Sequence, residues 1–190
     1  MSKQRLEAFT DGVIAILITI MVLDLHAPAT GDLAALGSLV PTMASYLLSF
    51  IFLGIYWNSH HHLLHAAVRI DGTVLWANLH LLFWLSLVPL VTSWMGAHHD
   101  ESGPTAVYGA VLLGAGVAFT FLQVRLRRLA GPDSVLARVS TGDRKARVSV
   151  ALNVLAVGVA FVRPGAAQLL YLAGASLWFV PDRQVEREFG

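Results

Sequence analysis

The chain has 190 residues, of which 56% are hydrophobic and 13% are charged, and its formal net charge is +1. A soluble domain of this size cannot hide so much apolar surface, and the charged share is about half of the roughly 25% found in globular proteins. The composition argues against a soluble enzyme, a disordered chain and a nucleic-acid-binding protein, and it indicates an all-α integral membrane protein. The absence of cysteine excludes disulfides and thiolate metal sites.

Four apolar stretches are long enough for a helix that crosses about 30 Å of hydrocarbon, which needs roughly 20 residues. The first, at about residues 6–25, extends well past a signal-peptide core and has no small-residue cleavage site, so we expect it to be retained. The next three lie at about residues 39–60, 73–96 and 104–126.

Two shorter apolar stretches follow, at about residues 147–162 and 166–181, with Arg163-Pro164-Gly165 between them. Proline cannot continue a helix and glycine relaxes the backbone, so this tripeptide predicts a tight turn. We interpret the pair as an antiparallel hairpin of two spans; a re-entrant pair that does not cross is the alternative, because each has only about 15 apolar residues. The sequence thus predicts one six-span domain over residues 1–190.

The lysines and arginines lie almost entirely on one side of this arrangement. Only Arg163 of the 13 falls on the other side. The others are Lys3, Arg5, Arg69, Arg125, Arg127, Arg128, Arg138, Arg144, Lys145, Arg147, Arg183 and Arg187. Because cytoplasmic loops carry the excess of basic residues, both termini are predicted to be cytoplasmic, in a plasma-membrane protein.

Charged residues cluster at the start of the first span, where Arg5, Glu7 and Asp11 surround Phe9 and Thr10. Charged groups inside a membrane are costly and usually mark function. Arg5 and Asp11 are about 9 Å apart along a helix, so each needs a partner on another helix. Ordinary anchoring at the membrane interface is the alternative interpretation.

Beyond Asp11, the first span is apolar as far as Asp24 except for Thr19. Ile16, Ile20 and Leu23 follow i, i+4, i+7 spacing and therefore line one helix face, to which Thr19 is adjacent. In isolation, such a stripe is typical of a face that packs against other helices or meets lipid.

Polar side chains also occur at the end of the second span and early in the third. His60, His61 and Asn78 are expected near the cytoplasmic leaflet with Asp11, where they could join one interhelical network. The i, i+4 spacing of His61 and His65 would suit zinc on a helix, but imidazoles at a helix end more often bond neighbouring side chains or headgroups.

The chain resembles the transmembrane protein 175 family of potassium channels in its bacterial form, with a single repeat of six spans. The motifs that carry the resemblance are Arg5-Leu-Glu-Ala-Phe9-Thr10-Asp11, Trp57-x-x-His60-His61 and Leu75-Trp76-Ala-Asn78-Leu79. They lie within roughly residues 5–95. Thr10 stands where the family usually has Ser, so the hydroxyl is kept and a methyl group is added.

The resemblance implies a homotetramer in the lipid bilayer, with the first span of each subunit lining a central pore for potassium ions. It implies no enzyme activity, no cofactor, no bound metal and no nucleic-acid partner. By position relative to Asp11, Ile16, Ile20 and Leu23 match the family's apolar constriction and gate, and Thr19 matches a polar layer implicated in potassium preference. The residues that match its interhelical network are Arg5, Phe9, Thr10, Asp11, Trp57, His60, His61 and Asn78.

We therefore predict a leak-type channel with modest preference for K⁺ over Na⁺. Weak voltage dependence is expected because no span is rich in arginine, and no Thr-Val-Gly-Tyr-Gly stretch supplies a carbonyl filter. Acidic residues are expected to give the outer mouth a negative field; they are Asp24, Asp32, Asp100 and Glu101. The alternative is a secondary transporter or metal-ion carrier that uses the cytoplasmic His cluster, although such proteins need carboxylates near the membrane midplane.

Overall fold

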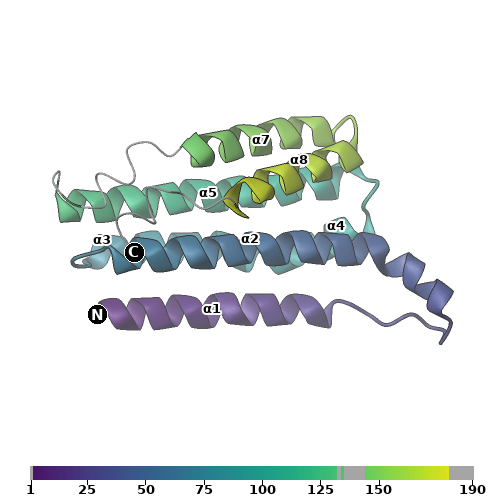
Figure 1. The fold of residues 1–190 in the computed structure, drawn as a ribbon, viewed down its shortest axis with the longest axis horizontal. Helices are drawn as coiled ribbons and strands as arrows, with labels where there is room; N and C mark the ends of the chain where they lie inside the picture. The colour runs from purple at the N-terminus through teal and green to yellow at the C-terminus, as the bar shows by residue number, and fades with distance from the viewer. Residues whose placement is uncertain (1, 132–133, 135–143, 180–190) are drawn as a thin grey trace.

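The structure is a computed structural model that describes residues 2–131, 134 and 144–179. Arg138, Arg183, Arg187 and the end of the sixth predicted span therefore lie outside the described residues. Within the described part, every regular element is helical, as the composition predicts. Figure 1 shows the long helices lying side by side along a common axis.

The first two long helices, α1 (Lys3–Leu23) and α2 (Val40–His65), run antiparallel (Figure 1). The side chain of Ser2 caps the N-terminus of α1 by accepting a hydrogen bond from the Arg5 N–H. A short 3₁₀ helix, η1 (Leu33–Leu39), leads directly into α2. Because α2 continues past the predicted end of the second span, the whole histidine cluster lies on a helix.

The third predicted span is divided into α3 (Gly72–Ser86) and α4 (Val88–Ala97), with Leu87 between them. Pro89 lies in the first turn of α4, where its missing N–H costs no helical hydrogen bond. The proline thus explains why one apolar stretch forms two successive helices, which together run parallel to α1 (Figure 1).

Asp71 caps the N-terminus of α3. Its carboxylate accepts hydrogen bonds from the Val74 N–H at 2.9 Å and from the Thr73 hydroxyl at 2.7 Å. These two bonds, the Val74 bond first, hold the pKa of Asp71 below its usual value of 3.8, because they favour the charged form.

The Asp71 cap is expected to make stability depend on pH under acidic conditions. A carboxylate with a lowered pKa contributes fully above its unfolded pKa, and the contribution disappears as pH falls through the lower pKa of the folded state. Asp71→Asn keeps a capping side chain but cannot titrate. We expect the wild-type unfolding temperature in detergent to fall below that of the variant only when the pH drops below 3.8. Equal temperatures for both proteins across this range would contradict the assignment.

The remaining helices are α5 (Ser102–Ala130), α7 (Arg144–Ala160) and α8 (Pro164–Ser176), followed by the 3₁₀ turn η2 (Leu177–Phe179). Helices α7 and α8 form an antiparallel pair (Figure 1), and Pro164 is the first residue of α8. The predicted helical hairpin and its turn are therefore confirmed.

Length and composition make four segments of the described residues able to cross a membrane. They are Lys3–Leu23, Leu33–His65, Gly72–Ala97 and Ser102–Ala130. Helices α7 and α8 have only 17 and 13 residues. The six-span topology thus remains a prediction, which depends on the hairpin crossing the bilayer.

Helix α5 lies in the core, whereas α1 lies at the edge of the bundle. At Gly114 of α5, an added Cβ would overlap the Trp84 ring of α3, and at Gly109 it would overlap Tyr171 of α8. Glycine at these positions lets both neighbours pack closely on α5. In the most apolar stretch of α1 only 28% of the residues are buried, the same share as in Leu33–His65, compared with 56% in α5. Helix α1 therefore leaves much of its apolar surface uncovered by its own chain.

Candidate functional site

One face of α1 packs against the bundle. Leu6, Ile14, Leu17 and Met21 are buried on this face, and Thr10 lies buried among them. Their spacing of three or four residues gives one continuous stripe on a helix. Helix α1 contacts α2, α3 and α4, so this stripe fixes α1 on three helices.

The opposite face of α1 carries the predicted constriction residues. The exposed fractions are 57% for Ile16, 43% for Ile20 and 74% for Leu23. Thr19 is exposed on the same side of the helix, and its hydroxyl donates a hydrogen bond of 2.9 Å to the Ile16 carbonyl oxygen. Since its one hydrogen is used within the helix, the Thr19 oxygen keeps lone pairs for a ligand outside the chain.

A buried hydrogen-bonded chain joins α1, α3 and α2. The Asn78 amide nitrogen donates to the Thr10 hydroxyl oxygen at 2.9 Å, and the Asn78 amide oxygen lies 2.8 Å from His60 Nε2. An amide oxygen only accepts, so His60 carries a proton on Nε2. Thr10, His60 and Asn78 are each at most 1% exposed. The chain therefore links three helices inside the protein, and Thr10 supplies the hydroxyl despite its extra methyl group.

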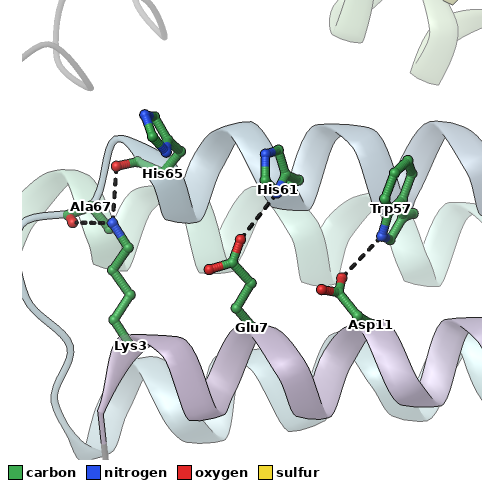
Figure 2. A network of polar contacts seen from close by, with 7 residues as sticks. All are labelled: Lys3, Glu7, Asp11, Trp57, His61, His65 and Ala67. Carbon is green, nitrogen blue, oxygen red and sulfur yellow. Dashed lines mark hydrogen bonds and ion pairs between the residues drawn. The ribbon is translucent and has the colours of Figure 1, made fainter.

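A second set of contacts joins α1 to α2 at the bundle surface, as Figure 2 shows. Lys3 Nζ donates to the carbonyl oxygens of His65 and Ala67 at 3.0 and 3.1 Å. One turn along α1, Glu7 Oε1 lies 3.0 Å from His61 Nδ1. One turn further, Asp11 Oδ1 accepts a hydrogen bond of 3.0 Å from Trp57 Nε1. The contacts recur every four residues on both antiparallel helices. They set the axial register of α1 against α2.

The structure thus divides the predicted network into two sets. Asp11 and His61 belong to the surface set, whereas His60 and Asn78 belong to the buried chain. Arg5 takes part in neither, and within the described residues no side-chain partner is recorded for it.

Two other observations complete the placement of the predicted network residues. Phe9 is 50% exposed and shares the outward face of α1 with Arg5. The sequence placed Glu7 in the charged cluster but gave it no partner, and it did not single out Lys3. Glu7 and Asp11 have the same i, i+4 spacing as Trp57 and His61, and this shared spacing was the signal for their pairing.

The histidine cluster on α2 forms a stack of rings. The His61 ring lies 6.4 Å from Trp57 and 6.3 Å from His65, both nearly parallel to it. In the part of the chain that the structure describes, no group of three or more His, Asp or Glu residues is placed to hold a metal ion. Two rings of this stack, Trp57 and His61, instead make the surface contacts with α1.

The predicted outer acids gather at the bundle end away from the N-terminus. Asp24 follows α1, Asp32 caps η1, and Asp100 and Glu101 precede α5. Asp100 Oδ2 lies 3.2 Å from His99 Nε2, but the Asp100 side chain is 91% exposed. Most of the charge of this acidic end therefore remains open to solvent.

One buried polar cluster was missed from the sequence. Ser49 Oγ of α2 lies 2.6 Å from Thr92 Oγ1 of α4 and 3.0 Å from Tyr108 Oη of α5. All three residues are at most 5% exposed. Single hydroxyl residues within apolar spans have no distinctive spacing, so no signal in the sequence joins them.

Comparisons with known proteins bear on the whole chain. A family model described as "Endosomal/lysosomal potassium channel TMEM175" matches residues 5–89. A potassium channel of a Chryseobacterium species is 43% identical over 187 residues, which cover 98% of this chain and 97% of that protein. A potassium channel of Streptomyces collinus is 34% identical over 175 residues, which cover 83% and 82% of the two chains.

A solved structure has the same fold. It is the crystal structure of a lysosomal potassium-selective channel TMEM175 homolog from Chamaesiphon minutus, with a TM-score of 0.82 at 24% sequence identity. The match covers 93% of this chain and 96% of the other. The likeness in fold therefore extends over most of the chain.

Proposed function

As this chain belongs to the TMEM175 family, we propose that it is a potassium channel of the plasma membrane. The bacterial relatives compared above are named as potassium channels and not as enzymes. The single observation that carries the proposal is the uncovered face of α1, which bears Ile16, Ile20 and Leu23.

A purely lipid-facing stripe would explain those three side chains but not the polar residue beside them. Thr19 lies within the span on the same exposed side of α1. Polar groups within spans usually face a protein interior or a water-filled cavity. In our proposal, four copies of the chain place this side of α1 around a central pore.

The constriction works through its apolar surface. Four copies of Ile16 form a ring that blocks ions when it is narrow, because an empty apolar neck tends to dewet. When the ring widens slightly, partly dehydrated ions pass. Potassium gives up its water more readily than sodium, so such a neck favours potassium modestly. Ile20 and Leu23 add apolar layers toward the acidic end.

Thr19 supplies the polar layer next to the constriction. Its hydroxyl hydrogen is bonded to the Ile16 carbonyl, so the oxygen lone pairs are the part offered to the pore. Four such oxygens can replace part of the water that a potassium ion loses. This orientation suits a cation and disfavours an anion.

The ends of the channel follow from the charges. The basic end, with Lys3 and Arg5, is cytoplasmic in our proposal, by the positive-inside rule. The acids Asp24, Asp32, Asp100 and Glu101 then surround the outer mouth, where their field concentrates cations. Because the span centres carry no row of arginines, the current should depend only weakly on voltage.

The test is ion flux into liposomes that contain the purified protein. We expect potassium flux to exceed sodium flux. We also expect the flux to rise with the ion gradient without saturating, whereas the flux through a carrier would saturate. Cross-linking should give a ladder that ends at the tetramer. Folded protein that passes neither ion would contradict the proposal.

Thr19→Val should lower the K⁺/Na⁺ flux ratio, because valine has the same shape but no lone pairs. We expect a fall of about threefold, the size of a typical hydroxyl contribution in a membrane. Thr19→Ser is the matched control and should keep the wild-type ratio. If Thr19→Val also keeps it, Thr19 does not form the polar layer.

A further inference from the structure

The two halves of α1 are held in different ways. Over residues 3–11, Lys3, Glu7, Thr10 and Asp11 all bond to α2 or α3. Over residues 12–23, the side-chain hydrogen bond that the structure records is that of Thr19, and it stays within α1. The half that bears the constriction is therefore positioned by apolar packing alone.

Helix α4 lies behind this apolar half. The Thr10–Asn78 bond places those two residues side by side on parallel helices. Counting equally far from each of them brings Thr19 level with Leu87, where α3 has ended. Ile20 and Leu23 therefore lie at the level of α4, which contacts α1.

Helix α4 is separated from α3 at Leu87 and needs its own anchor. The hydroxyl cluster supplies one, and its direction follows from the hydrogens available. Thr92 donates its hydrogen to the Val88 carbonyl oxygen at 2.7 Å. Ser49 must then donate to Thr92, and Tyr108 must donate to Ser49. The result is a directed chain from α5 through α2 to α4.

The α2 member of this hydroxyl chain lies at the depth of the proposed polar layer. The Asp11–Trp57 contact sets the register of the antiparallel helices α1 and α2. Counting equally far from that pair, in opposite directions along the two chains, brings Ser49 level with Thr19. The α2 end of the anchor is thus level with Thr19, whereas Thr92, counted from the Thr10–Asn78 pair, is level with Asp24 at the outer end of α1.

We propose that Ser49 and Thr92 are positioning residues for ion selection. Their hydroxyl chain holds α4 in place, and α4 holds Thr19 and Ile20 at the level where they meet the ion. This inference rests on the proposed channel function and extends it to side chains that are buried away from the exposed face of α1.

The test is the K⁺/Na⁺ flux ratio of Thr92→Val in liposomes. Valine fills the same volume but cannot accept from Ser49, so α4 loses its side-chain hydrogen bond to α2. We expect the ratio to fall about threefold, while the yield of assembled protein stays at the wild-type level. Thr92→Ser keeps the hydroxyl and should restore the ratio.

A purely structural role would give a different pattern, with lower yield and equal losses of potassium and sodium flux. Ser49→Ala should reproduce the change in ratio, and the double variant should add little, because both residues act in one chain. Thr120→Val is the matched control, since among the described residues the bond recorded for the Thr120 hydroxyl is to Gly116 of its own helix.

The outcomes separate this inference from the channel proposal. If Thr92→Val keeps the wild-type ratio while Thr19→Val lowers it, the positioning role is wrong and the channel remains. If the wild type conducts neither ion, both fail together. Should Thr92→Val not assemble, Ser49→Ala breaks the same bond from the α2 side; a wild-type ratio in assembled Ser49→Ala also overturns the inference.

Discussion

Replacing Ile16 with asparagine is expected to turn the proposed constriction into a leak that passes potassium and sodium at similar rates. A ring of four amides stays wet, so the barrier from dewetting disappears. We expect ion flux to rise by about tenfold, which corresponds to roughly 1.4 kcal/mol off the barrier. Liposome flux with each cation, normalised to the amount of tetramer, measures both effects.

The control for Ile16→Asn places the same amide on another exposed surface. Leu169 on α8 is 67% exposed, and Leu169→Asn should leave both fluxes unchanged. If Ile16→Asn and Leu169→Asn behave alike, the exposed face of α1 does not line the pore. A lipid-facing position for Ile16 would then be the correct interpretation.

Asn78→Ala is expected to have the largest effect on folding and assembly. The variant removes the middle of the buried chain, so the Thr10 hydroxyl and His60 Nε2 both lose their partner. Each buried polar atom without a partner costs about 1–3 kcal/mol. Thermal unfolding in detergent should therefore begin at a lower temperature, and size-exclusion chromatography should show less assembled protein.

Asn58→Ala provides the comparison for this loss, because Asn58 is an exposed asparagine on α2. We expect its unfolding temperature and assembly to match the wild type. Should both variants unfold at the same temperature, the buried chain contributes nothing to stability. Residues 3–11 of α1 would then be held in place by their surface contacts with α2 and by apolar packing.

Much of the helix arrangement could be predicted because its signals are local. Pro164, after Arg163 and before Gly165, marked the turn of the hairpin. The i, i+4, i+7 spacing of Ile16, Ile20 and Leu23 predicted a shared face, which the structure leaves exposed. These features depend on helix geometry and proline chemistry alone.

The pairing of the polar residues could not be predicted in the same way. Which α1 residue meets His60 or His61 depends on the axial register of α1 against α2 and on which side of α2 faces α3. His60 and His61 are adjacent in sequence, yet they bond to different helices. Successive side chains on a helix point about 100° apart. His60 therefore belongs to the buried hydrogen-bonded chain, whereas His61 belongs to the surface contacts.

The Ser49–Thr92–Tyr108 cluster could not be predicted from the sequence for a related reason. Its members come from three helices, and each is one hydroxyl in an otherwise apolar surrounding. Only the packing of α4 between α2 and α5 brings them together. Whether the short α7–α8 hairpin crosses the bilayer is likewise decided by tertiary packing, because α7 has 17 residues and α8 only 13, whereas a span needs about 17 or more.

Lys3, the first residue of α1, contacts the C-terminal end of α2. The last carbonyl groups of a helix have no partner within it and carry its negative end. Lys3 donates to the His65 and Ala67 carbonyl oxygens, so its ammonium group serves as a C-terminal cap for α2 supplied from α1. A purification tag, truncation or lysine acetylation at this point would disturb both helices at once, and tags for this protein are better placed elsewhere.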